Sequence, residues 1–501
     1  MRLSSWLRSA RSLFVPKGTK QGHRPTRLTT RAPSTRLSVL QLEDRTVPST
    51  FTVGNLADSG SDSLRAAIAA ANANPGADVI TFASGLWGTV ALTSGELGIT
   101  DDLRIDGPGA GRLTVSGNDA SRVFRIDSGA AVSIDDLTIT RGRGLLRGGG
   151  ILNAGTLTLT GAVVSDNVVV GLPGGTQASD AMGGGILSTG TLTVRHTLFS
   201  GNRSVGGDGI VGSPGSTALG GALMSVGTPA GPAMATVTHC TFLDNEAVGG
   251  AIGVGPFSRT GLGGAIMNAG GTTTVSHSLF NGNRAVGGAG GGFAGGFGAG
   301  GAIANIALAR NATISVSHST LVNNQAIGGA AAPGRSPQNG RGGAIANFTA
   351  AAATLPVTAT ASVSHSTILG NRAIGGTGTT GGNGQGGGIE NGGILTVSNS
   401  LIALNRAIGG AGDGGNGGNG QGGGIFNGAP NPFGTPSLTL QRSIVALNRA
   451  DGGAASNGGN AGTGVGGGLY LAPGGLASAD LSAIFANDAS TSDDDVFGIL
   501  A

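Results

Sequence analysis

Residues 263–288 read GGAIMNAGGTTTVSHSLFNGNRAVGG, and copies of this stretch recur from about residue 148 to the C-terminus. Each copy opens with a glycine pair or triplet that leads into an aliphatic residue, at Ile151, Ile186, Leu223, Ile266, Ile303, Ile345, Ile389, Ile425 and Leu469. Each copy closes on an asparagine, at Asn167, Asn202, Asn245, Asn283, Asn324, Asn371, Asn405, Asn448 and Asn487. Successive closing asparagines are 34 to 47 residues apart, which indicates a repeat architecture.

Composition restricts the fold class and the partners. Charged residues make up 11% of the chain, against about 25% in an average globular protein, and 101 of the 501 residues are glycine. This composition excludes a helical bundle and favours short strands joined by turns. Ten of the 29 Arg and Lys residues lie in segment 1–50, so the rest of the chain carries 19 basic and 24 acidic residues. We therefore expect no nucleic-acid partner.

Segment 1–50 is a basic leader that we expect to be disordered. Its longest apolar run, 13–15, is far shorter than the roughly 7–15 residues of a secretory signal core, and no run in the chain has membrane-spanning length. Within the leader, RLSVLQLEDRTVPS at 36–49 resembles the LE-R-x-x-P motif that precedes many large bacterial surface and exported proteins. That resemblance implies an extracellular or cell-surface location.

Residues 51–82 read as strand, helix and strand. Asp62 or Ser63 can cap the helix, and its apolar face holds Leu64, Ala67, Ile68 and Ala71. The segment resembles the SLRxAIxxAN region found in front of bacterial right-handed parallel β-helices, although Asp62 stands where a cysteine often precedes the serine. We expect a cap and first turn at 51–100, the coil at 101–487 and a C-terminal tail at 488–501.

Within one copy, Leu192, Val194 and Phe199 face one way in strand runs of three to five residues. Such short strands can pair only with the same strand of the next copy, about 4.8 Å away, so that like residues lie on like. The GGAI and FxxN pattern resembles the repeats of chlamydial polymorphic outer-membrane proteins. The predicted fold is all-β, a right-handed parallel β-helix of the pectate-lyase type, with a short N-terminal capping helix and glycine-rich arms.

The glycine-rich arms run from each closing asparagine to the next glycine pair, a distance of 15 to 18 residues, whereas the other part of the copy varies from 16 to 26. Composition predicts a flexible linker. The constant length instead favours arms that stack on one another as extended strands. The sequence leaves both interpretations open.

Two side-chain rows could carry chemistry. His196, His239, His277, His318 and His365 occupy one position in five consecutive copies, followed by Asn399. Stacked copies would bring their rings to about 5 Å, where they could share a metal ion. No carboxylate or thiolate recurs beside them, so we favour a structural ladder, as for the closing asparagines, and predict no metal and no cofactor. The second row could contact an acidic ligand and comprises Arg203, Arg284, Arg372, Arg406 and Arg449.

An enzyme of the polysaccharide lyase or glycoside hydrolase type remains an alternative, because parallel β-helices include such enzymes. Their chemistry needs carboxylates from different turns to converge in one groove with a basic residue. The adjacent pairs Asp101–Asp102 and Asp135–Asp136 alternate sides on a strand, and no lysine follows Lys20. We assign no catalytic residue, and Cys240, which occupies the slot of Ser278, is predicted to be a small buried thiol.

The favoured function is therefore a non-catalytic structural or adhesive protein that binds polysaccharide or cell-envelope components through a repetitive surface; a passive surface scaffold is a third alternative. Nothing after Asn487 resembles an amphipathic lid. We expect an open last turn that permits end-to-end self-association.

Overall fold

The computed structural model describes residues 48–173, 179–209, 215–229, 231–251, 260–290, 294–335, 337–350, 356–428 and 434–500. All of them belong to one compact unit, Thr46–Ala501. The basic leader and its LE-R-x-x-P motif lie outside the described residues, apart from Pro48 and the two residues that follow it.

The N-terminal cap is built as the sequence predicts. The helix α1 (Leu64–Ala73) follows Ser63, whose hydroxyl accepts a hydrogen bond from the Ala66 N–H at 3.2 Å. Its buried face is Leu64, Ala67, Ile68 and Ala71. These side chains join the core of the coil, so α1 covers apolar surface that the first turn would otherwise expose.

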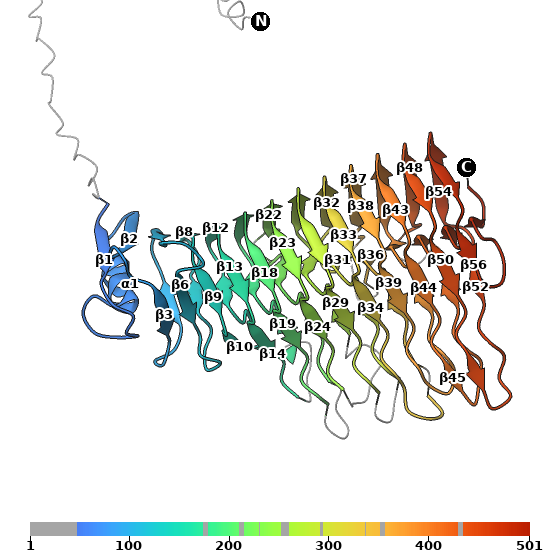
Figure 1. The fold of residues 1–501 in the computed structure, drawn as a ribbon, viewed down its shortest axis with the longest axis horizontal. Helices are drawn as coiled ribbons and strands as arrows, with labels where there is room; N and C mark the ends of the chain where they lie inside the picture. Colours follow the sequence, from blue (N-terminus) through green and yellow to red (C-terminus); the bar gives the residue numbers. More distant parts are fainter. Residues whose placement is uncertain are drawn as a thin grey trace, which may run out of the picture. The chain divides into compact units, whose positions relative to one another are not determined.

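In the described part of the chain the strands form six parallel sheets, named A to E plus one short pair. Each regular turn of the coil, or rung, contributes one strand to sheets C, A, B, D and E in that order, so neighbours within a sheet come from consecutive rungs (Figure 1). Sheet A contains β1 (Thr50–Val53), β2 (Asp78–Phe82), β5 (Leu103–Asp106), β8 (Ala131–Asp135), β12 (Thr156–Thr160), β17 (Thr191–Arg195), β22 (Met234–Thr238), β27 (Thr272–Ser276), β32 (Ala312–Ser317), β37 (Ala359–Ser364), β42 (Ile394–Ser398), β48 (Ser437–Gln441) and β54 (Leu476–Asp480). Sheet B contains β3 (Gly88–Ala91), β6 (Leu113–Ser116), β9 (Thr138–Thr140), β13 (Val163–Ser165), β18 (Leu198–Ser200), β23 (Thr241–Leu243), β28 (Leu279–Asn281), β33 (Thr320–Val322), β38 (Thr367–Leu369), β43 (Leu401–Ala403), β49 (Ile444–Ala446) and β55 (Ala483–Phe485).

The remaining sheets complete each rung. Sheet C contains β4 (Leu97–Ile99), β7 (Phe124–Ile126), β11 (Ile151–Asn153), β16 (Ile186–Ser188), β21 (Leu223–Val226), β26 (Ile266–Ala269), β31 (Ile303–Ala307), β36 (Ile345–Thr349), β41 (Ile389–Gly392), β47 (Ile425–Asn427), β53 (Leu469–Leu471) and β57 (Val496–Phe497). Sheet D contains β10 (Arg143–Leu145), β14 (Val168–Val170), β19 (Arg203–Val205), β24 (Glu246–Val248), β29 (Arg284–Val286), β34 (Gln325–Ile327), β39 (Arg372–Ile374), β44 (Arg406–Ile408), β50 (Arg449–Asp451) and β56 (Asp488–Ala489). Sheet E contains β15 (Ala181–Met182), β20 (Ala218–Leu219), β25 (Gly261–Leu262), β30 (Gly298–Ala299), β35 (Gly340–Arg341), β40 (Gly384–Gln385), β46 (Gly420–Gln421) and β52 (Gly464–Val465), and the short pair is β45 (Gly412–Asp413) with β51 (Ala455–Ser456).

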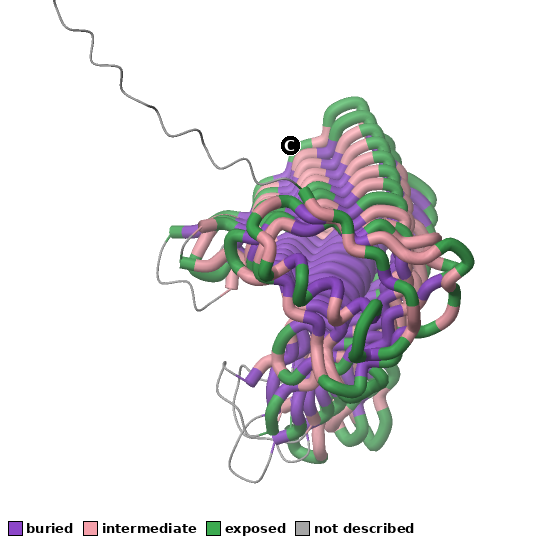
Figure 2. The backbone as a smooth tube through the Cα atoms, turned by 90° about the vertical axis from the view of Figure 1, so that its left-hand side faces the viewer, coloured by how far each residue is buried: buried purple, intermediate pink, exposed green. Residues whose placement is uncertain are grey.

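The register places like residues on like, which confirms the predicted parallel β-helix. Phe199 pairs with Phe242 and Phe242 with Phe280, and their rings stack with centroids 4.7 and 4.6 Å apart. Along the coil axis the buried backbone of successive rungs superposes (Figure 2). Apolar side chains at alternate strand positions thus form one continuous core.

The glycine-rich arms are stacked, so the flexible-linker interpretation is wrong for their described parts. Each arm leaves sheet D, turns back and enters sheet E. Outgoing and returning segments of successive rungs alternate along the axis and are joined by backbone hydrogen bonds of 2.8–2.9 Å, from Gly382 N to Gly376 O, Gly410 N to Gly382 O, Gly418 N to Gly410 O, Gly453 N to Gly418 O and Gly462 N to Gly453 O. A Cβ on Gly375 would lie 1.9 Å from the Gly382 carbonyl oxygen, so the backbones approach too closely for any other residue.

Gly375→Ala is therefore expected to separate the arm from its neighbours while the coil stays folded. Limited proteolysis should cut the variant within residues 375–384 much faster than the wild type, and the far-UV circular dichroism should be nearly unchanged. Gly111→Ala is the control, because a Cβ there meets nothing within 4 Å. Equal protection of Gly375→Ala and the wild type would contradict the stacked arrangement.

The chain after Asn487 continues the coil. β56 extends sheet D and β57 extends sheet C, and the Asp495 carboxylate accepts hydrogen bonds from Asn487 N and Nδ2 at 3.1 and 2.9 Å. β54 and β55 each pair on one side only among the described strands. End-to-end self-association through these strands stays a prediction.

Candidate functional site

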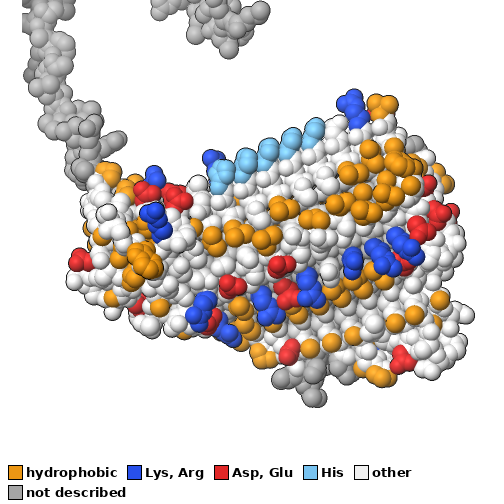
Figure 3. Space-filling view, in the orientation of Figure 1, with side chains coloured by type: hydrophobic (Ala, Val, Ile, Leu, Met, Phe, Trp, Pro, Cys, Tyr) orange, Lys and Arg blue, Asp and Glu red, His pale blue; other side chains and the backbone are white. Residues whose placement is uncertain are grey.

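The five arginines singled out in the sequence lie in one line on sheet D. Each occupies the first position of its strand, in the register Arg203, Glu246, Arg284, Gln325, Arg372, Arg406, Arg449. The middle residue of each strand is buried, so the first position faces outward. We call Arg203, Arg284, Arg372, Arg406 and Arg449 the guanidinium stripe. Basic side chains form a line across this face (Figure 3).

Acidic neighbours orient the stripe without burying it. Glu246 accepts from Arg203 Nε and from Arg284 Nη1, each at 3.1 Å. Asp451 pairs with both Arg406 and Arg449, and its hydrogen bond raises the pKa of Arg449. The four paired arginine side chains remain 44–51% exposed, whereas Glu246 and Asp451 are 18% and 11% exposed. Positive charge is thus presented outward over Glu246 and Asp451, whereas Asp488, which pairs with Arg449 at 2.9 Å, is itself 57% exposed.

Arg372 differs from the other members of the stripe. Its neighbours in the sheet are Gln325 and Arg406, and it is exposed. Within the described part of the chain it has no ion pair. The middle of the stripe therefore carries an uncompensated charge.

The five histidines form a stacked column at the turn between sheets A and B. Consecutive ring centroids are 4.8–5.0 Å apart with interplanar angles of 3–19°. Every ring is exposed on a residue with φ of 48–53°. Stacked rings present their nitrogens side by side, whereas a chelate needs nitrogens that converge on one point. Among the described residues, no group of three or more His, Cys, Asp or Glu side chains is arranged to hold a metal ion.

The closing asparagines form a buried ladder between sheets B and D. In each step the Nδ2 of one asparagine donates to the Oδ1 of the next, at 2.9 Å. The same Oδ1 also accepts from the previous backbone N–H, as in the 3.0 Å bond from Asn283 N to Asn324 Oδ1. These side chains satisfy backbone groups at a buried turn, and no ligand can reach them there.

Sequence reasoning missed a second buried asparagine ladder at the end of sheet C. Its steps are Nδ2-to-Oδ1 bonds of 2.7–2.8 Å that link Asn268, Asn305, Asn347, Asn391 and Asn427. The signal was available, because each of these asparagines stands two residues after the aliphatic residue that opens its copy. Their Nδ2 groups also bond carbonyls where the chain enters sheet A, so this ladder is structural.

Three of the four acidic residues considered for catalysis, Asp101, Asp102 and Asp135, have structural partners. Asp101 and Asp102 accept backbone hydrogen bonds from Gly76 and Ala131 at 3.2 and 2.8 Å. Asp135 and Asp106 both pair with Arg104, at 3.2 and 3.3 Å. Arg104, Asp106 and Asp135 form an ion-pair network on the outer face of sheet A. Cys240 is buried, and burial raises the pKa of its thiol to about 11.

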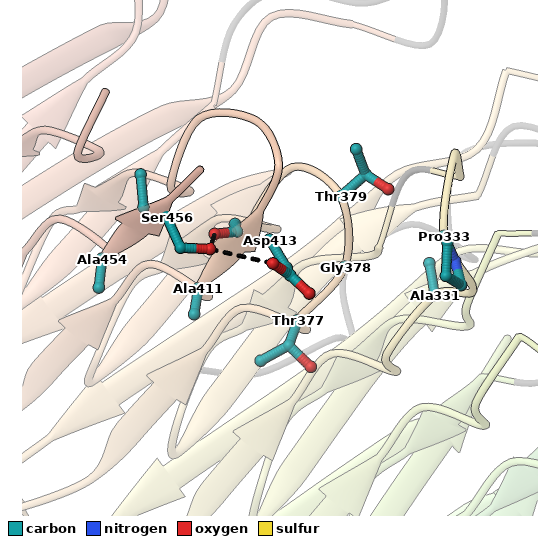
Figure 4. Close-up of a pocket in the computed structure, with 11 residues that line it drawn as sticks. Ala331, Pro333, Thr377, Gly378, Thr379, Ala411, Asp413, Ala454 and Ser456 are labelled. Carbon is teal, nitrogen blue, oxygen red and sulfur yellow. Dashed lines mark hydrogen bonds between the residues drawn. The ribbon is translucent and has the colours of Figure 1, made fainter. Parts of the chain in front are cut away.

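A hollow of about 370 Å³ lies among the arms of four successive rungs, lined by residues that include Thr377, Thr379, Asp413 and Ser456 (Figure 4). The Asp413 carboxylate accepts from Ser456 Oγ at 3.0 Å and from Asn457 Nδ2 at 2.8 Å. Asp413 is the single titratable group among the residues that line this hollow. The described lining of this hollow therefore holds no two converging carboxylates, which is the arrangement that glycoside hydrolysis uses.

Among the described residues no helix is long and apolar enough to cross a membrane. No protein-family model matches the chain, and no curated protein matches it. Among solved structures, a mannuronic-acid-specific polysaccharide family 6 lyase from the human gut microbiota is similar over 90% of this chain and 91% of its own, with 11% sequence identity and a TM-score of 0.41.

Proposed function

We propose that this chain is a non-catalytic structural or adhesive protein of the cell surface or extracellular space, and that it binds acidic polysaccharide of the cell envelope through the guanidinium stripe. The observation that carries the proposal is the register of sheet D, which sets five outward arginines in one line. An acidic polymer is itself a line of repeated anions, so it can contact several members of the stripe at once.

The affinity of such a surface is a sum over many weak contacts. One exposed guanidinium–anion contact contributes only about 0.2–1 kcal/mol. A polymer held by one contact forms the next as an intramolecular step, which raises the overall affinity without any tighter site. The ion pairs to Glu246 and Asp451 hold four of the guanidinium groups in place before the ligand arrives, which reduces the entropy lost on binding.

The test compares two triple variants on an immobilised acidic polysaccharide. Arg284→Gln/Arg372→Gln/Arg406→Gln is expected to weaken retention roughly 10-fold or more and to reduce its salt dependence. Arg104→Gln/Arg112→Gln/Arg195→Gln removes the same charge from exposed positions outside the stripe and should change retention little. If the two variants lost retention equally, net charge alone would explain the binding, and the proposal would be wrong.

A further inference from the structure

The outer face of sheet B changes character along the coil. At the third strand position, Thr140, Ser165 and Ser200 of the early strands give way to Leu369 and Phe485 in later strands. The first position is apolar in early strands too, at Val163 and Leu198. We call the following six residues the apolar patch: Leu369, Leu401, Leu404, Ile444, Leu447 and Phe485. Hydrophobic side chains gather there, above the guanidinium stripe (Figure 3).

Four members of the patch are exposed, and Leu369 and Leu401 are half-buried. Leu401 pairs with Ile444, and Ala446 pairs with Phe485, so its members lie on adjacent strands. Leu404 and Leu447 are each 55% exposed, Ile444 is 43% exposed and Phe485 is 50% exposed. Exposed apolar side chains that lie together on adjacent strands form a candidate binding surface.

Leu404 and Leu447 also occupy a backbone conformation that does not suit them. Their φ values are 56° and 58°, in the left-handed region, at the turn that precedes a closing asparagine. Six earlier copies fill this position with residues that tolerate it, Asp166, Gly201, Asp244, Gly282, Asn323 and Gly370. Folding alone disfavours an exposed leucine at this turn, so the stability of the fold does not explain these two leucines.

Cationic groups border the patch on both sides. Arg442 is exposed at the turn directly before Ile444. Arg406 and Arg449 follow Leu404 and Leu447 by two residues on the opposite side, and both are about half exposed. The acids nearby are Asp451, which lies beneath these two arginines, Asp488, which pairs with Arg449, and the exposed Asp480, whose backbone carbonyl accepts from Arg442 N at 2.9 Å. The patch is thus an apolar surface bordered by exposed guanidinium groups on two sides.

We propose that the apolar patch docks on the surface of a lipid bilayer that carries anionic headgroups. Leucines that project from turns can enter the boundary between headgroups and acyl chains, to a depth of about 5–10 Å. The arginines on both sides then lie at the level of the lipid phosphates, which guanidinium groups bind in a bidentate manner. This surface is additional to the binding of acidic polymers by the whole stripe, because its affinity depends on the leucines.

The experiment is cosedimentation of the full chain with phosphatidylglycerol/phosphatidylcholine vesicles, with phosphatidylcholine vesicles and with soluble dextran sulfate. Leu404→Asn/Leu447→Asn places at both turns the residue found at Asn323, and its unfolding midpoint should equal or exceed that of the wild type. We expect it to lower partitioning onto anionic vesicles roughly 10-fold while binding to dextran sulfate is unchanged. The matched control, Met234→Thr/Ile394→Thr, removes two apolar side chains that are 56% and 42% exposed on sheet A, and it should bind vesicles like the wild type.

Three results would overturn the proposal: no binding of the wild type to anionic vesicles, equal binding of Leu404→Asn/Leu447→Asn, or an equal loss on dextran sulfate. Self-association that the double variant abolishes, without vesicle binding, would assign the patch to a second copy of the chain. Ile444→Thr supplies a second variant of the patch, and it should lower vesicle partitioning in the same direction.

Discussion

Asn324→Ala is expected to lower the free energy of unfolding by about 4 kcal/mol or more, although it removes only one small side chain. The Asn324 Nδ2 donates to Asn371 Oδ1 at 2.9 Å and to the Phe280 carbonyl at 3.1 Å. Its Oδ1 accepts from Asn283 N and Nδ2 at 3.0 and 2.9 Å. All of these groups are buried, so alanine leaves several donors and acceptors unsatisfied at once.

Asn324→Ala should also reduce the cooperativity of unfolding. In a repeat array stability depends on contacts between neighbouring rungs, so a break in the middle of the ladder weakens the coupling between its two halves. Urea unfolding followed by circular dichroism should show an earlier and broader transition for the variant. Asn323→Gly is the control, because Asn323 is exposed and its φ of 56° suits glycine. A shift for Asn324→Ala no larger than for this control would contradict the ladder's role.

The sequence predicts the features that the repeat itself encodes. In a parallel coil, residues that occupy the same position in successive copies lie next to one another along the axis. The spacing of the copies alone therefore predicts the closing asparagines, the histidine column and the guanidinium stripe. The capping helix follows from local signals, Ser63 at its start and the apolar face that begins at Leu64. These are consequences of period and of local propensity.

The arms show where composition misleads. Glycine-rich sequence is usually flexible because isolated glycine backbone has no partner and loses much entropy on ordering. Here each arm lies between two others, and backbone hydrogen bonds such as Gly418 N to Gly410 O at 2.9 Å offset that loss. The constant length of the arm was the signal for stacking. The sequence of a single repeat does not show that outgoing and returning segments of neighbouring arms alternate along the axis.

The contact between Arg341 and Glu390 could not be predicted, because each residue occurs once in its column. Arg341 belongs to sheet E, in a column with Leu219, Leu262 and Ala299. Glu390 belongs to sheet C, in a column with Met267, Ala304 and Ala346. Periodicity reveals only residues that recur, so it cannot predict a contact between two residues that each occur once and lie on different sheets.

Glu390→Ala is expected to lower the free energy of unfolding by roughly 2–3 kcal/mol, because it leaves the Arg341 guanidinium, which is only 26% exposed, without its carboxylate partner. The Glu390 side chain is 1% exposed and pairs with Arg341, which also lies 4.8 Å above the Phe348 ring. Glu390 Oε2 and Arg341 Nε are buried without a hydrogen-bond partner among the described residues. The hydrogen-bonding groups of this ion pair are therefore incompletely satisfied, and removal of Glu390 leaves more of the Arg341 donors without an acceptor.

Arg341→Leu/Glu390→Met should restore stability to the wild-type level or above it, because it places at these positions the residues Leu219 and Met267, which occupy the equivalent positions of earlier rungs and belong to one apolar cluster. Burial raises the pKa of Glu390 above its ordinary value of 4.5, and the charge of Arg341 offsets only part of that rise. The folded chain then keeps this proton at pH values where the unfolded chain has lost it, so the wild type loses stability as pH rises above about 4.5. The advantage of the double variant in urea midpoint should accordingly grow from pH 4 to pH 8. A double variant as unstable as Glu390→Ala at every pH would show that the charges, not the packing, hold the arm against sheet C.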